Sequence, residues 1–147
     1  RLSWQLPLRR HRSYLLNISK YMATNILVVD DSLTMRLIVQ AAMVGAGWKV
    51  VLATNGKEAL DKSQGGSFDL VLSDWNMPVM GGLGFIQGLR AQPKYKDTPV
   101  LVLTTEEDDV SKAAARELDV SGWVNKPVDP DGLVEFVAEL LGIEPPN

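Results

Sequence analysis

The chain has 147 residues, 46% of them hydrophobic, which is enough for one domain with a single sizeable core and leaves no room for a second domain. Its apolar runs fall far short of the roughly 20 residues that cross a bilayer, and it contains no cysteine, so we expect a cytoplasmic protein without disulfides or membrane association. All 18 acidic residues lie after residue 22, and this acidic body argues against nucleic-acid binding.

The first 22 residues differ from the body in charge, because they contain five basic residues and no acid. Met22 and the two residues after it resemble the natural start of a protein whose first strand opens at Asn25. We therefore interpret residues 1–22 as a basic extension that is non-native or disordered, with a targeting peptide or a basic arm as the alternatives. The domain is expected at 23–142, followed by a short tail at 143–147.

Strand and helix patterns alternate through the first half of the body. Residues 25–30 form a β-branched run that suits burial on both faces, and Ser32 can cap the helix that follows. Asn55 and Glu58 have capping-box spacing at the start of a second helix. We expect strands at 25–30, 48–53 and 68–74, and helices at 32–46 and 55–64.

The second half continues the alternation. Acidic residues 106–109 suit the positive end of a helix dipole, and Asp129 followed by Pro130 is typical of a helix start. We expect helices at 82–91, from 106 to at least 118, and at 129–141, with strands at 98–104 and 121–125. The residues expected to face inward are Leu83, Ile86 and Leu89 in the first of these helices, Val110, Ala113, Ala114 and Leu118 in the second, and Leu133, Val137, Leu140 and Leu141 in the last.

Five strand–helix units with short connections predict an α/β fold, in which helices cover both faces of a parallel sheet. Four of the five strands end on side chains that can handle a phosphoryl group. Because the carboxyl ends of parallel strands meet in one crevice, these side chains predict one site. They are Asp30 and Asp31, Asp74, Thr104 and Lys126.

The three aspartates predict a cation site. Carboxylates about 5 Å apart repel by roughly 3 kcal/mol per pair at an effective dielectric of 20, so a site that gathers three of them needs a positive ion. Ligands that are all oxygen indicate Mg²⁺, a hard ion that binds through a few carboxylates together with water and phosphate oxygens.

Four separated motifs carry a resemblance to a known family. They are Asp30-Asp31, Asp74-Trp-Asn-Met-Pro78, Thr104-Thr-Glu106 and Lys126-Pro127. In identity, order and spacing the sequence resembles the CheY-like receiver domains of two-component signalling, over about residues 23–142. The resemblance implies a flavodoxin-like (βα)5 fold with strand order 2-1-3-4-5, and a stand-alone response regulator of the chemotaxis type. It also implies a cis peptide bond between Lys126 and Pro127.

The resemblance also implies a role for each site residue. Asp74 would be the phosphoacceptor, Thr104 and Lys126 would contact the phosphoryl group, and Trp123 would be a switch residue that follows Thr104, although it could equally be an ordinary large side chain. Asn76 and Glu106 would tune dephosphorylation. The Mg²⁺ ligands would be Asp30, Asp31, Asp74 and the backbone carbonyl of Asn76.

The implied partners are a histidine kinase as phosphodonor and an output protein. The output protein would bind the face made by the fourth helix, the fifth strand and the fifth helix. Two alternatives remain: a phosphorelay intermediate that passes its phosphate to a histidine phosphotransfer protein, and an aspartate-based phosphohydrolase. The second is disfavoured, because such enzymes generally place an acid/base aspartate two residues after the nucleophile, where this chain has Asn76.

Overall fold

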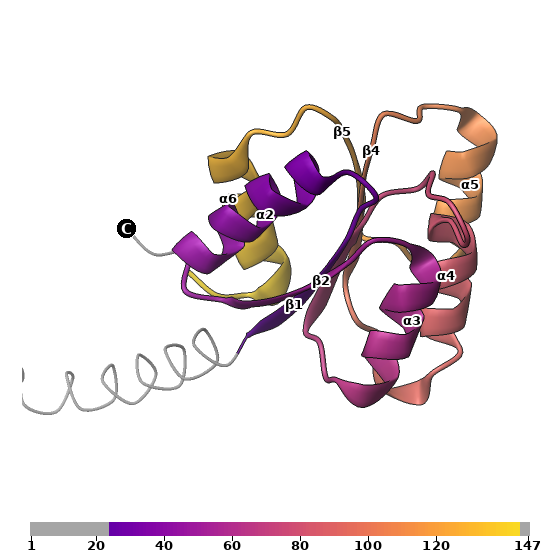
Figure 1. Ribbon diagram of the computed structural model, residues 1–147, viewed down its shortest axis with the longest axis horizontal. Coiled ribbons are helices and arrows are strands. Elements are labelled where there is room, and N and C mark those ends of the chain that lie inside the picture. The colour runs from indigo at the N-terminus through magenta and orange to yellow at the C-terminus, as the bar shows by residue number, and fades with distance from the viewer. Residues whose placement is uncertain (1–23, 145–147) are drawn as a thin grey trace, which may run out of the picture.

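The computed structural model describes residues 24–144, in which five parallel strands form one sheet in the order β2-β1-β3-β4-β5 (Figure 1). The flavodoxin-like order implied by the resemblance is therefore confirmed. Each strand begins and ends within two residues of its predicted bounds. The strands are β1 Asn25–Val29, β2 Lys49–Ala53, β3 Leu70–Ser73, β4 Val100–Thr104 and β5 Gly122–Asn125.

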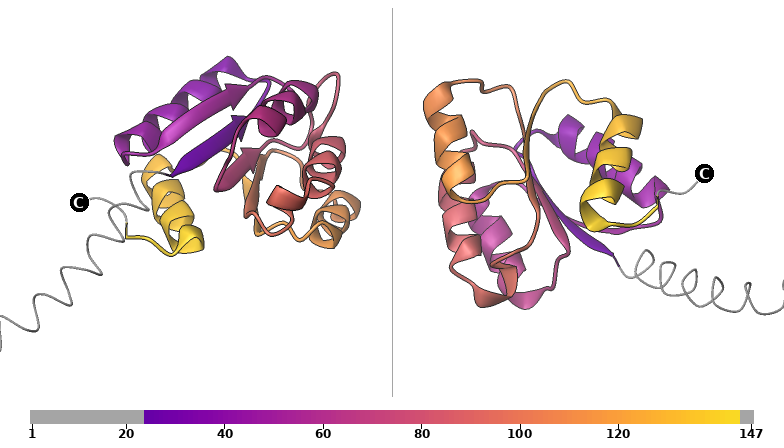
Figure 2. Two further views of the ribbon diagram at one scale, coloured as in Figure 1. Left: turned by 90° about the horizontal axis from the view of Figure 1, so that it is seen from below. Right: turned by 180° about the vertical axis from the view of Figure 1, so that it is seen from behind.

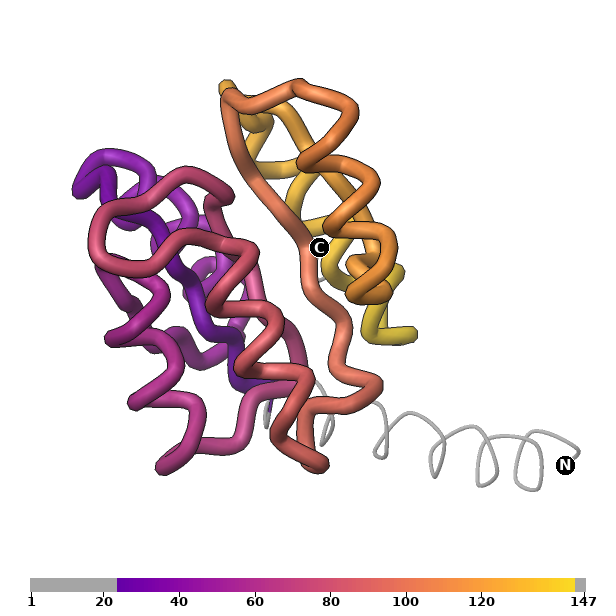
Figure 3. The backbone as a smooth tube through the Cα atoms, turned by 90° about the vertical axis from the view of Figure 1, so that its right-hand side faces the viewer, coloured from indigo at the N-terminus to yellow at the C-terminus, as the bar shows by residue number. Residues whose placement is uncertain are grey.

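Helices cover both faces of the sheet. One face carries α2 and α6, and the other carries α3, α4 and α5 (Figures 1 and 2). Figure 3 shows the second group side by side. A short 3-10 helix after α4, named η1, was not predicted. The helices are α2 Leu33–Gly45, α3 Gly56–Gly65, α4 Gly82–Arg90, η1 Pro93–Tyr95, α5 Asp109–Glu117 and α6 Pro130–Leu141, and none in the described part of the chain could span a membrane.

The sheet separates two hydrophobic cores, and β1 contributes to both. Successive side chains of a strand point to opposite faces. Ile26 and Val28 pack in the core under α2 and α6, while Leu27 and Val29 pack in the core under α3, α4 and α5. All four side chains are buried. Burial on both faces explains why β1 is a continuous apolar run rather than an alternating one.

The predicted helix starts are confirmed at three positions. The side chains of Ser32, Asn55 and Asp129 each accept a hydrogen bond from the backbone N–H three residues further on, at 3.3, 2.9 and 3.2 Å. These caps satisfy backbone donors that have no partner within the helix. The caps of α2 and α6 lie directly after β1 and after the loop that follows β5, so they also fix the chain where strands end at the site.

The predicted inner faces of α4 and α5 are partly wrong. Val110 is 80% exposed and Leu83 is 38% exposed, whereas Phe85 and Ala115 are buried. α5 begins only at Asp109, so the acidic residues before it form a loop rather than a first helical turn. The buried residue of α5, Ala115, lies near the C-terminal end of the helix, where the helix meets the core. The apolar pattern of the sequence did not predict this position.

Candidate functional site

The sheet register brings the first two predicted site residues together. Val29 and Ser73 are register partners in the adjacent strands β1 and β3, and Asp30 and Asp74 directly follow them. The backbone N–H of Asp74 donates to the carbonyl of Val29 at 2.8 Å, which continues the pairing one residue past β3. The two carboxylates therefore leave neighbouring strands at the same level of the sheet.

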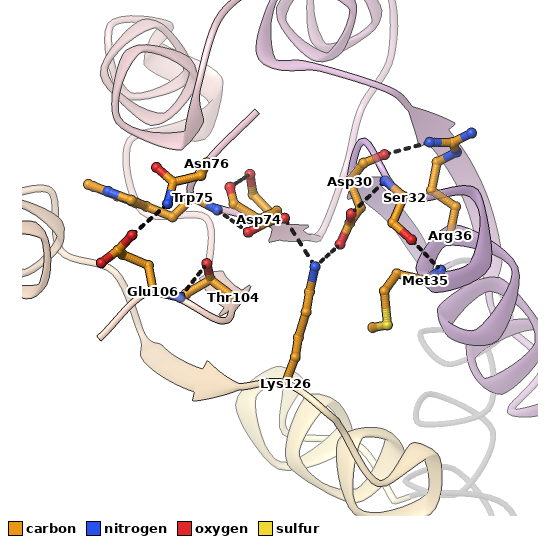
Figure 4. A network of polar contacts seen from close by, with 11 residues as sticks. Asp30, Ser32, Met35, Arg36, Asp74, Trp75, Asn76, Thr104, Glu106 and Lys126 are labelled. Atoms are coloured by element: carbon orange, nitrogen blue, oxygen red, sulfur yellow. Dashed lines mark hydrogen bonds and ion pairs between the residues drawn. The ribbon is translucent and has the colours of Figure 1, made fainter. Parts of the chain in front are cut away.

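Asp31 joins these two carboxylates. Oxygen atoms of Asp30, Asp31 and Asp74 all lie within 4.8 Å of one another. Asp30 and Asp74 are buried and Asp31 is exposed. The backbone N–H of Ser32 donates to Asp30 Oδ1 at 2.9 Å, and that of Trp75 donates to Asp74 Oδ1 at 2.7 Å, so local backbone groups orient both buried carboxylates (Figure 4).

Lys126 bridges the two buried aspartates. Its Nζ lies 2.7 Å from Asp30 Oδ2 and 3.0 Å from Asp74 Oδ2 (Figure 4). The lysine follows β5, and its backbone N–H donates to the carbonyl of Thr104 at 2.9 Å, which fixes the start of its side chain beside β4. The peptide bond between Lys126 and Pro127 is cis, as the resemblance implied.

Burial and the ion pairs shift the pKa values of Lys126 and Asp30. Burial would lower the pKa of Lys126, but its hydrogen bonds with Asp30 and Asp74 outweigh burial and raise it. Burial raises the pKa of Asp30 above 3.8, and the hydrogen bonds from Lys126 and Ser32 only partly offset this effect, while the neighbouring Asp74 carboxylate adds to it. Lys126 therefore stays charged, and this one ammonium pairs with two of the three clustered carboxylates.

The second part of the site is a set of contacts around Glu106. Thr104 is buried at the end of β4, and its Oγ1 accepts a hydrogen bond from the Glu106 N–H at 3.1 Å. Asn76 Nδ2 donates to Glu106 Oε2 at 2.7 Å across the mouth of the site (Figure 4). Trp123 Nε1 donates to the Glu106 backbone carbonyl at 3.0 Å. The loop after β4 is thereby joined both to the loop after β3 and to β5.

Some contacts at the site were not predicted. Arg36 Nη1 donates to the backbone carbonyl of Asp30 at 2.7 Å, a pairing six residues apart that no motif indicated. The ring of Trp75 lies 5.3 Å from that of Trp123, at 55°. A side chain on Gly82 would lie 2.6 Å from the Asp74 carbonyl, so glycine allows α4 to begin directly behind Asp74.

The residues present fit a Mg²⁺ ion. The three carboxylates offer only oxygen ligands, and among the described residues the Asp31 carboxylate makes no hydrogen bond or ion pair, so it remains available to a ligand. The negative charge left by the single lysine is of the sign that a divalent cation would balance. Coordination by the backbone carbonyl of Asn76 stays a prediction.

The fold and this arrangement of side chains are those of a receiver domain. A model of the response regulator receiver domain family matches residues 26–138, and the chain belongs to that family. The resemblance that the sequence motifs carried is therefore confirmed.

Several characterised proteins are similar over most of their length. Chemotaxis protein CheY homolog of Campylobacter jejuni is 37% identical over 119 residues, which cover 80% of this chain and 92% of the relative. Chemotaxis protein CheY1 of Helicobacter pylori is 37% identical, covering 80% and 96%. The structure of Vibrio cholerae chemotaxis protein CheY4 matches with a TM-score of 0.76 and 39% identity, covering 80% and 98%. A response regulator from Burkholderia multivorans matches with a TM-score of 0.69 and 47% identity, covering 86% and 99%.

Proposed function

We propose that this chain is a phosphorylation-activated response regulator in which Asp74 accepts a phosphoryl group from a histidine kinase. The observation that carries the proposal is the buried Asp74 carboxylate, paired with Lys126 at 3.0 Å and grouped with two further aspartates. Family membership supports the phosphodonor, and the similarity to chemotaxis proteins supports a chemotaxis-type pathway in the cytoplasm.

The transfer needs a nucleophile and neutralisation of phosphoryl charge. A carboxylate oxygen of Asp74 attacks the phosphorus of the phosphohistidine, the P–N bond breaks with its electron pair on the imidazole nitrogen, and an acyl phosphate forms. Lys126 neutralises the phosphoryl oxygens, and the Thr104 hydroxyl donates to one of them. Bound Mg²⁺ supplies further charge neutralisation. Its ligands would be Asp30, Asp31, Asp74 and the carbonyl of Asn76.

The same site reverses the modification. Water attacks the phosphorus of the acyl phosphate, which releases inorganic phosphate and regenerates the Asp74 carboxylate. Asn76 and Glu106 are polar, lie at the mouth of the site and hydrogen-bond to each other at 2.7 Å, so they are placed to orient that water. We expect self-dephosphorylation to be relatively fast, and a bulky apolar residue in place of Glu106 to slow it by obstructing water.

The message passes to a partner protein through what we term the output face, made of α5, β5 and α6. Phosphorylation adds about 1.5 to 2 negative charges at Asp74 and draws the Thr104 hydroxyl toward them. Trp123, which is tied to the same loop, then shifts with it. The side chains expected on this face are Asp109, Lys112, Arg116, Trp123 and Phe136.

The acceptor assignment is tested with acetyl phosphate and Mg²⁺. Wild type should gain one phosphoryl group, detected by intact mass and by Phos-tag electrophoresis, and Asp74→Asn should gain none. Asp61→Asn is the matched control, since Asp61 is an exposed aspartate on α3 with only a 3.7 Å contact to Lys57. Equal labelling of Asp74→Asn and the control would refute the assignment.

The residue two positions after Asp74 supports a receiver over a phosphohydrolase. The amide of Asn76 cannot exchange a proton with a leaving group as an aspartate would, and it donates to Glu106 instead. Repeated turnover of small phosphoesters would contradict this assignment, whereas a receiver should accept one group and lose it without turning over an ester substrate.

A further inference from the structure

Arg90, the last residue of α4, holds the C-terminal end of α5. Its Nε donates to the carbonyl of Leu118 at 3.0 Å and its Nη2 to that of Asp119 at 3.2 Å, immediately after the helix. Its Nη1 donates to the carbonyls of Tyr95 and Thr98 at 2.7 and 2.6 Å. One guanidinium thus joins the end of α5 to the segment between η1 and β4, and its charge complements the negative end of the α5 dipole.

The N-terminal end of α5 is attached through the loop that follows β4. Its cap, Asp108, accepts from Ser111 in the first turn, Asn125 of β5 donates to Glu107 just before the cap, and Val110 is exposed. Ala115 is the buried residue of the helix, and Leu118 packs against the core just beyond it. The packing of α5 on the core is therefore concentrated at its C-terminal end, whereas its N-terminal end is attached by hydrogen bonds of the loop that adjoins the site.

An open surface cavity lies between α5 and β5. It has a volume of about 240 Å³ and is lined by Lys112, Ala115 and Arg116 of α5, by Gly122 and Trp123 of β5 and by the residues that connect the two elements. The cavity lies on the output face, so a change in the angle of α5 would alter that face directly.

The site is connected to the N-terminal end of α5. Glu106 lies just before α5 and contacts Thr104, Asn76 and Trp123 through its backbone and side chain. A displacement at Thr104 therefore reaches α5 at its N-terminal end first. If the N-terminal end of α5 is displaced while its C-terminal end stays fixed, the helix rotates about its C-terminal end.

We propose that Arg90 is the pivot of the switch: a positioning residue that fixes the C-terminal end of α5, so that changes at Thr104 and Glu106 rotate the helix about that end. The inference rests on the proposed function, because the displacement that it transmits is the one caused by phosphorylation. Arg90 itself touches neither the acceptor nor the phosphoryl group.

Amide hydrogen exchange with and without beryllofluoride and Mg²⁺ tests the pivot. In wild type, the beryllofluoride-dependent change should be large at 106–112 and small at 115–119. In Arg90→Lys, which keeps the charge but not the forked donors, residues 115–119 should exchange roughly tenfold faster and should also respond to beryllofluoride. Lys94→Met is the matched control, because Lys94 also donates to backbone carbonyls, those of Gln64 and Gly66, but at the C-terminal end of α3. It should behave as wild type.

The outcomes separate the two proposals. If beryllofluoride fails to saturate wild type by tryptophan fluorescence, the proposed function is wrong. If it saturates but the wild-type change is uniform along α5, or Arg90→Lys matches Lys94→Met, the pivot is wrong and Arg90 is only structural. Should Arg90→Lys not fold, Arg90→Gln replaces it, and the wild-type gradient remains decisive on its own.

Discussion

Lys126 takes both of its ion-pair partners from distant strands. Asp30 lies 96 residues and Asp74 52 residues before it in the sequence. Because its side chain is only 13% exposed, removing it would leave two buried carboxylates without compensation, a change that costs stability whatever the residue does chemically. Variants of Lys126 therefore mix structural and functional effects, which is why Asp74 is the sharper position for testing the chemistry.

Val79 adopts a backbone conformation that suits a different residue type. Its φ is 70°, in the left-handed region, and its side chain is 79% exposed in the loop between β3 and α4. A β-branched residue is strained there, at a cost of roughly 1–2 kcal/mol. Asparagine accepts this region more readily, and the exposed valine has little packing to lose.

Val79→Asn should therefore raise the free energy of unfolding by about 1 kcal/mol. The matched control is Val110→Asn, which makes the same replacement at an equally exposed valine with helical backbone, where the two residues have similar helix propensity. Urea unfolding of both variants against wild type measures the effect. A stability gain at Val110 as large as that at Val79, or no gain at Val79, would rule out relief of strain.

The outer edge of the sheet is protected by its neighbouring helix. Lys62 of α3 donates to the carbonyl of Leu52 in the edge strand β2 at 2.6 Å and to Glu58 Oε1 at 2.9 Å. Glu58 Oε2 in turn accepts from the Thr54 hydroxyl at 2.7 Å, just after β2. A charged side chain on an edge strand discourages pairing with other chains, and here the helix supplies it. Hydrogen bonds from Lys62 and then Thr54 lower the pKa of Glu58.

Glu58→Gln should reduce stability in a pH-dependent way. A lowered folded-state pKa means that Glu58 contributes its full stabilisation above its ordinary value of 4.5 and loses it as the pH falls through the lowered value. At about pH 6 the variant should be less stable by a few tenths of a kcal/mol, since both side chains of the pair are partly exposed to solvent. The deficit should shrink as the pH falls below 4.5 in urea titrations. Asp61→Asn on the same helix is the control for the loss of one carboxylate from α3.

At the scale of the whole molecule, the clustered carboxylates that form the site also lower the stability of the domain by repelling one another. The fold brings oxygen atoms of three carboxylates within 4.8 Å of one another, and Lys126 pairs with only two of these carboxylates. A ligand that binds only the folded state stabilises the entire domain, by about 2.7 kcal/mol at one hundred times its dissociation constant. Mg²⁺ should therefore raise the stability of the domain.

Asp31→Ala should abolish most of that gain without harming the metal-free protein. Asp31 is exposed and makes no ion pair among the described residues, so its removal relieves repulsion rather than breaking a contact. Mg²⁺ affinity should fall by roughly tenfold or more. Thermal unfolding with Mg²⁺ and with a chelator measures both effects, and Asp61→Ala is the control. Loss of stability in metal-free buffer would contradict the argument.

The sequence by itself determined the order of strands and helices along the chain. Turn and capping residues such as Ser32 and Asn55 fixed the helix starts, because these side chains act on backbone groups three residues away. The run at 25–29 fixed a doubly buried strand. The positions of Asp74 and Lys126 at strand ends then predicted a shared site, since parallel strands deliver their carboxyl ends to one edge.

Only the tertiary structure decided which atoms meet at that edge. The way in which loops from different strands fold over one another decides which of the three carboxylates Lys126 pairs with. It also brings Asn76 into contact with Glu106. The exposure of Val110 and the anchoring of α5 by Arg90 depend on how one helix docks on the sheet. Periodicity describes a helix in isolation, but its buried face and its fixed end are properties of what it packs against.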